Sequence, residues 1–129
     1  MTFKNNHPTE SELEILQVLW AQGPSSVRKV NEILNEKRNI GYTTSLKIMQ
    51  IMTEKGLVTR DTKSRTHIYQ AAVKEGETQS SLLDSFINKT YRGCAKSLVL
   101  QALGKEKTSP EELAEIKALI SKMQENNND

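Results

Sequence analysis

Changes of local pattern within the first 75 residues restrict the folds that are open to this chain of 129 residues. Up to residue 55 the apolar residues recur every three to four positions, which is the period of an amphipathic helix. Breaks at Gly23-Pro24 and at Asn39-Ile40-Gly41 cut this stretch into three short helices. The pattern then changes to one typical of short strands. The chain is therefore expected to bury three helices and a hairpin in one shared core.

The first two helices carry their own start signals. Thr9, with Glu12 three residues later, is the pattern of a capping box, in which each side chain binds the other residue's backbone N–H. Ser25 or Ser26 is suited to cap the second helix, because a serine oxygen accepts from the free N–H groups of a first helical turn. Apolar residues follow at helical spacing in both segments: Leu13, Leu16, Leu19 and Trp20, then Val27, Val30 and Leu34.

The third helix is expected to begin at Thr43 or Thr44, with Thr43 as its cap, and to end at Lys55 before Gly56. Its inner face is predicted from the residues at helical spacing, which are Ser45, Ile48, Met49 and Met52. The opposite face then carries short polar and basic side chains.

Two short strands are predicted after this helix, over residues 57–60 and 66–70. The loop between them is polar and turn-forming, so the pair is expected to form a β-hairpin. Lys63 and Arg65 make its tip basic. Three helices followed by a hairpin is the order of a winged helix-turn-helix. The predicted fold class is mainly α with a small β-hairpin, a winged helix-turn-helix followed by C-terminal dimerisation helices.

The pattern is helical again from Gly76 onward, and we predict a winged-helix domain over 1–74 and a helical region over 75–129. Ser109-Pro110 followed by Glu112 is a strong helix start. The apolar surface of this region exceeds what a short tail can bury, and a second copy of the chain is the simplest partner. The residues predicted to form the homodimer interface are Leu82, Phe86, Leu98, Leu113, Ile116, Ile120 and Met123.

The charge is uneven along the chain. The formal net charge of +2 divides into +3 over residues 1–73 and −1 over the remainder. A local basic excess on a near-neutral protein is a modest indication of a phosphate-bearing partner.

Composition argues against several classes of protein. Cys94 is the only cysteine, which excludes a disulfide framework and a multi-cysteine zinc site, and we expect it to be a small core residue. With only two histidines and no pairing suited to catalysis, we predict no enzyme, no catalytic residue, no metal and no cofactor. No segment has the roughly 20 continuous apolar residues of a membrane span. The N-terminus lacks a secretory pattern, so a cytoplasmic protein without membrane insertion is expected.

The outward face of the third helix and the hairpin tip are the predicted binding surface. A recognition helix places its N-terminal residues against base edges in the major groove, where Gln50 is suited to bond an adenine bidentately. Lys63 and Arg65 are placed to reach phosphates. The residues predicted to contact DNA are Tyr42, Thr43, Thr44, Leu46, Lys47, Gln50, Lys63 and Arg65. Some have ordinary structural interpretations, Thr43 as a helix cap and Tyr42 as a partly buried aromatic residue.

Several segments of the chain, taken in order, resemble the penicillinase repressor family (BlaI/MecI type). Residues 9–20 are similar to its opening helix. Tyr42-Thr43-Thr44 and Lys55-Gly56-Leu57-Val58 are similar to its recognition helix and first strand, and residues 65–69 to its second wing strand. The resemblance covers most of residues 9–123. No one of these segments is diagnostic alone, and the resemblance is specific because they occur together in this order.

The resemblance implies a homodimeric repressor that binds a two-fold symmetric operator in double-stranded DNA. The third helix would contact bases, the wing the backbone, and the C-terminal helices the second subunit. A membrane sensor-protease pathway is a further implied partner, with the operon released when the C-terminal region is cleaved or perturbed. The alternative is a winged-helix protein-interaction module without sequence-specific DNA binding, for which Leu46 and Ile51 are the only support.

The chain departs from the family pattern in three places. Many relatives carry arginine where this chain has Ile51, so one phosphate or base contact is missing. The cleaved relatives have an Asn-Phe pair where this chain has Gln101-Ala102, which argues against cleavage at that bond. Copper-responsive relatives carry paired C-terminal cysteines, and their absence here excludes copper sensing through that motif.

Overall fold

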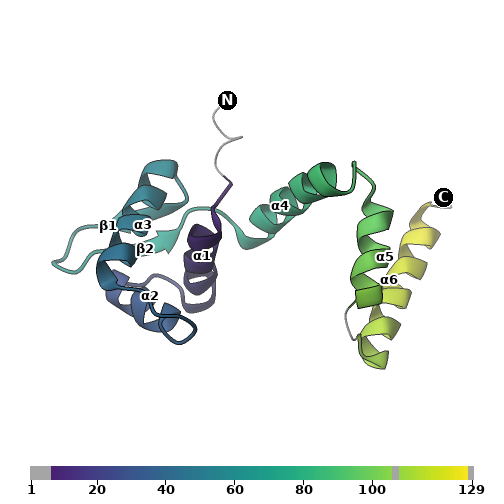
Figure 1. Ribbon diagram of the computed structural model, residues 1–129, viewed down its shortest axis with the longest axis horizontal. Coiled ribbons are helices and arrows are strands. Elements are labelled where there is room, and N and C mark those ends of the chain that lie inside the picture. Colours follow the sequence, from purple (N-terminus) through teal and green to yellow (C-terminus); the bar gives the residue numbers. More distant parts are fainter. Residues whose placement is uncertain (1–6, 106–107, 128–129) are drawn as a thin grey trace. The chain divides into compact units, whose positions relative to one another are not determined.

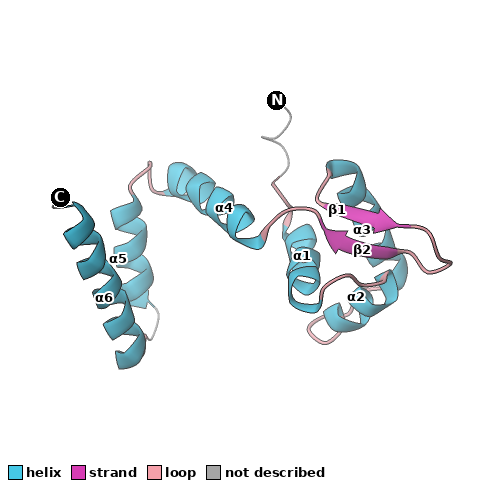
Figure 2. Ribbon diagram, turned by 180° about the vertical axis from the view of Figure 1, so that it is seen from behind, coloured by secondary structure: helices cyan, strands magenta, loops and turns pink. Residues whose placement is uncertain are grey.

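The computed structural model describes residues 7–105 and 108–127 and divides the chain into two compact units. The first unit runs up to Leu83 and the second starts at Asp84. In chain order the elements are α1 (Glu10–Gln22), α2 (Val27–Leu34), α3 (Tyr42–Lys55), β1 (Val58–Asp61), β2 (Ile68–Ala71), α4 (Glu75–Thr90), α5 (Ala95–Lys105) and α6 (Pro110–Asn127) (Figures 1 and 2). The predicted fold class, mainly α with one hairpin, is confirmed. No helix within the described ranges has both the length and the apolar character needed to cross a bilayer.

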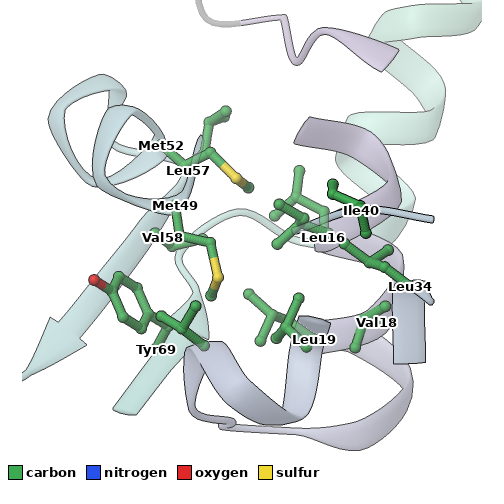
Figure 3. Packing of buried hydrophobic residues seen from close by; sticks show 13 residues of the cluster. Leu16, Val18, Leu19, Leu34, Ile40, Met49, Met52, Leu57, Val58 and Tyr69 are labelled. Atoms are coloured by element: carbon green, nitrogen blue, oxygen red, sulfur yellow. The ribbon is translucent and has the colours of Figure 1, made fainter. Parts of the chain in front are cut away.

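The core of the first unit lies where α1, α2, α3 and the hairpin meet (Figure 3). The predicted inner faces supply it: Leu16 of α1, Val30 of α2 and Met49 of α3 have no exposed surface. Burying one such side chain stabilises a fold by about 1.5–3 kcal/mol. Ile48 and Trp20 are partly buried at the edge of the core, and the Trp20 indole Nε1 donates to the Val73 carbonyl at 3.0 Å.

The capping box predicted at the start of α1 is present, and its glutamate also reaches α3. The Thr9 hydroxyl accepts from the Glu12 N–H at 3.2 Å, and the Glu12 carboxylate accepts from the Thr9 N–H at 2.9 Å. The same carboxylate oxygen lies 2.6 Å from the Lys55 Nζ. Because Glu12 is only 4% exposed, its charge would be costly without these partners. The start of α1 and the end of α3 are therefore held together.

Two asparagines fix the turn between α2 and α3. The Asn31 amide donates to the Ile40 carbonyl at 3.0 Å and to the Ser45 hydroxyl at 2.8 Å. The Asn35 amide donates to the same Ile40 carbonyl at 2.8 Å. Since Ser45 lies inside α3 and has no exposed surface, these bonds orient α3 relative to α2.

The caps of α2 and α3 were predicted with different success. Ser26 caps α2, as one of the two expected serines, by accepting from the Lys29 N–H at 3.2 Å. The prediction that Thr43 caps α3 is wrong, because the helix already begins at Tyr42 and its N-cap is Gly41, which has no side chain to offer. The predicted stop at Gly56 is confirmed, and its φ of 83° is one that glycine adopts without strain.

The two strands pair antiparallel, with Val58 opposite Ala71 and Asp61 opposite Ile68. They begin one and two residues later than expected, and the hairpin itself is confirmed. Tyr69 of β2 also pairs with Ser25, the residue before the cap of α2, through backbone bonds of 2.8 and 2.9 Å. The hairpin is thereby attached to the start of α2.

In the second unit, α5 and α6 run side by side (Figures 1 and 2). The chain turns between α4 and α5 at residues 91–94. The helix start predicted at Ser109-Pro110 is confirmed, because α6 begins with a capping box in which Ser109 and Glu112 exchange hydrogen bonds of 3.0 and 3.1 Å. The expectation that Cys94 is a core residue is wrong, since the thiol is exposed. A hydrogen bond from the Ser97 hydroxyl lowers the pKa of Cys94 below its ordinary value.

Asn31→Ala removes an amide that donates to two acceptors, so we expect the free energy of unfolding to fall by about 1–3 kcal/mol. Urea unfolding followed by circular dichroism measures the change. Asn39→Ala, at an exposed position in the same turn, is the control and should stay within about 0.5 kcal/mol of the parent chain. Equal losses in the two variants would contradict an orienting role for Asn31.

Candidate nucleic-acid interface

The two faces of α3 differ sharply. Ser45, Met49 and Met52 have no exposed surface and face the core. The residues predicted on the outward face, Thr43, Thr44, Lys47 and Gln50, are all exposed. Small hydroxyl side chains at the start of this face let the backbone approach a groove closely, and the first turn of α3 contains no acidic residue.

Tyr42 and Leu46 occupy one edge of this face. Tyr42 is 50% exposed, which agrees with its interpretation as a partly buried aromatic residue and leaves half of its surface accessible to a partner. Leu46 is half-buried and packs against the core. Ile51, on the other flank, is 40% exposed and is the larger apolar surface available to a protein partner.

The loop between the strands holds Lys63 and Arg65 at the surface. Its shape is fixed locally, because the Lys63 N–H donates to the Asp61 carboxylate at 2.9 Å and the Ser64 hydroxyl donates to the Thr66 carbonyl at 2.8 Å. Within residues 7–105 and 108–127 the ion pairs are Glu14–Arg38 and Glu12–Lys55. Lys63, Arg65 and Lys47 take part in neither, so their charges remain available to an anionic partner.

A hollow of about 290 Å³ brings residues from three elements together. Tyr42 and Leu46 reach it from α3, and Arg65 reaches it from the wing. Arg28, at the start of α2, and His67, just before β2, also line it, and sequence reasoning missed both. Arg28 lies two residues after Ser26, in the first turn of α2, and no local sequence signal connects it with the wing.

The predicted dimerisation residues are spread over α4, α5 and α6. Leu82 lies in α4 before the division between the units, and the others lie after it. Leu82, Leu98 and Ile116 are half-buried, whereas Phe86, Leu113, Ile120 and Met123 are between 47% and 55% exposed. The Phe86 ring meets the Tyr91 ring edge-on at 5.8 Å. In the described part of the chain these side chains therefore remain at least partly exposed.

No group of three or more potential metal ligands (histidine, cysteine, aspartate or glutamate) is gathered among the residues that the structure describes.

Comparison with known proteins identifies relatives of this chain. The chain is 25% identical over 122 residues to the methicillin resistance regulatory protein MecI of Mammaliicoccus sciuri, covering 95% of this chain and 99% of that protein. It is 23% identical over 112 residues to a penicillinase repressor of Bacillus licheniformis, covering 87% and 88%.

A solved structure of a MarR family protein from Bacillus stearothermophilus has a similar fold, with a TM-score of 0.50 and 20% identity, covering 99% of this chain and 81% of that one. The family model described as penicillinase repressor matches residues 8–122, which is nearly the whole of the described structure. The chain belongs to the penicillinase repressor family, as its sequence motifs predicted.

Proposed function

We propose that this protein is a transcriptional repressor that acts in the cytoplasm as a homodimer on an inverted-repeat operator in double-stranded DNA. The observation that carries the proposal is the outward face of α3, on which small polar side chains accompany one exposed cation, Lys47, together with the exposed Lys63 and Arg65 on the wing of the same unit. Membership of a family whose relatives are named as repressors supports it.

In this proposal α3 enters the major groove with its N-terminal end toward the base edges. Thr43 and Thr44 contact bases or thymine methyl groups, and Gln50 pairs with an adenine through two hydrogen bonds. Lys47 contributes a base or phosphate contact. Tyr42, Lys63 and Arg65 bind phosphates, which orient the helix without reading sequence.

The homodimer follows from the apolar surface of the C-terminal helices. Among the described residues of α5 and α6 none is buried, yet Leu100, Leu113 and Leu119 are each about half exposed or more. A second copy of the same surface would cover these side chains, and a two-fold dimer presents two recognition helices to an inverted repeat. Residues 1–74 then bind DNA, and residues 75–129 hold the dimer.

Repression is relieved, in this proposal, when the dimerisation region is cleaved or perturbed. One winged helix neutralises few phosphates, and tethering two raises the effective concentration of the second at its half-site. Separating the subunits therefore abolishes tight binding without any change at α3. A sensor-protease is a candidate source of the signal. The Gln101-Ala102 bond lies inside α5, where both residues are exposed.

Selection from a pool of random duplex DNA at near-physiological salt tests the proposal directly. We expect an enriched inverted repeat, which requires both sequence reading and a symmetric dimer. Weak, salt-sensitive binding without enrichment would overturn it and favour the alternative of a protein-interaction module, in which Leu46 and Ile51 contact protein.

Lys47→Ala should weaken binding to the selected operator by about 1 kcal/mol or more and relax the preference at the base pair it contacts. Fluorescence anisotropy on the operator and its single-base variants measures both effects. Lys37→Ala is the matched control, because Lys37 is an exposed cation that lines a different hollow, between α1 and α2. Similar losses in both variants would assign the effect to net charge and not to α3.

Arg65→Ala should weaken binding to operator and unrelated DNA by similar factors, since a phosphate contact carries no sequence information. The slope of log K against log salt should become less negative by about 0.9. An unchanged slope in a titration series would remove the wing from the set of phosphate contacts.

Leu113→Asp places a charge in the apolar surface of α6 and should convert the dimer to monomer at micromolar concentration. Sedimentation velocity measures the mass, and operator affinity should fall by about 100-fold as the avidity is lost. Ala118→Asp adds the same charge on the opposite side of α6 and serves as control. A dimer that survives Leu113→Asp but not Ala118→Asp would place the interface on the other face.

A further inference from the structure

The hollow between α2, α3 and the wing has the composition of an anion site. Arg28 lines it from α2, and Arg65 and His67 line it from the wing. The lining also includes three residues with hydroxyl groups, Ser26, Tyr42 and Thr66. No aspartate or glutamate is among the residues that line it. Its volume of about 290 Å³ is enough for one phosphate group with bound water.

Both arginines are available to a ligand. Neither Arg28 nor Arg65 takes part in the ion pairs found within residues 7–105 and 108–127. A guanidinium offers its donors in a planar fork that matches two phosphate oxygens. Two such groups facing one hollow without a carboxylate between them leave a positive potential that an anion would relieve.

The backbone holds this hollow open in advance. The paired bonds of 2.8 and 2.9 Å between Ser25 and Tyr69 keep the start of α2 beside β2. The first turn of α2 holds no acidic residue, so the positive end of the helix dipole is not compensated there. The backbone that carries Arg28 and Arg65 is therefore already in place, and binding would have to order only their side chains.

We propose that this hollow binds one phosphodiester of the DNA backbone, held jointly by Arg28 and Arg65 with His67 as a further donor. The inference rests on the proposed DNA-binding function and adds Arg28 and His67 to the surface that carries it. Because the hollow adjoins Tyr42 at the start of α3, a phosphate seated there sets how far α3 enters the groove. Arg28 is thus a positioning residue and reads no base.

The test uses the full chain and the operator obtained by selection, with single phosphates replaced in turn by neutral methylphosphonates. One phosphate should be found whose replacement weakens binding of the parent chain about tenfold. Arg28→Gln and Arg65→Ala should each weaken binding to the unmodified operator and lose part of the parent chain's sensitivity to replacement at that same phosphate. Sensitivity at two different phosphates would overturn a shared site.

Matched variants separate this site from general charge. Arg28→Lys keeps the charge and should retain part of the affinity, whereas Arg28→Gln should make the salt slope less negative by about 0.9 and leave the selected sequence unchanged. Lys29→Gln, an exposed neighbour that does not line the hollow, should remain sensitive at the shared phosphate. A change of selected sequence in Arg28→Gln would overturn the positioning role.

Inorganic phosphate distinguishes the two possible sources of the anion. Millimolar phosphate should shift the NMR signals of Arg28 and His67 and compete weakly with DNA. Tight phosphate binding, together with DNA affinity that Arg28→Gln leaves intact, would overturn the DNA backbone as the source. If selection enriches a sequence but Arg28→Gln has no effect, this inference fails alone. If no DNA is enriched, the proposed function fails first.

Discussion

The paired backbone hydrogen bonds between Ser25 and Tyr69 are the constraint on which the rest of the binding surface depends. They join the residue just before the cap of α2 to the middle of β2, two positions far apart in the chain. Tyr69 is 1% exposed, so the same residue anchors the hairpin in the core. A two-stranded hairpin is only marginally stable on its own. These bonds, together with the burial of Leu57 and Val58 in the core, keep it in a defined place beside α3.

The core and the outward surface are two faces of the same helix. Met49 and Met52 are buried in the core and contribute to its hydrophobic stabilisation, whereas Lys47 and Gln50 are exposed and take no part in core packing. The amide of Asn31 adds a directional contact to Ser45, which packing of apolar groups alone cannot supply. The position of α3 is therefore set from its buried side, which leaves its exposed side free of packing constraints.

Local signals in the sequence predicted the helices, the hairpin and most caps, because these depend on residues three or four positions apart. The failure at Thr43 has a local cause as well, since a glycine with extended backbone can serve as N-cap without a side-chain bond. Arg28 and His67 could not be found in this way, because only the pairing of Ser25 with Tyr69 brings them to one hollow. The prediction that Cys94 is buried failed because the apolar residues around it indicate a core, whereas none of these residues is buried in the described chain.

The second unit has one more consequence, which concerns how much protein is present. Among its described residues no hydrophobic side chain is buried, and in the proposed homodimer the second copy supplies the missing burial. For such a unit folding and assembly are one equilibrium, and the midpoint of unfolding rises with concentration. In a newly synthesised chain at low concentration the first unit would be folded and the second would not. The number of copies per cell would thus determine how much of the second unit is folded, as well as how much repressor is present.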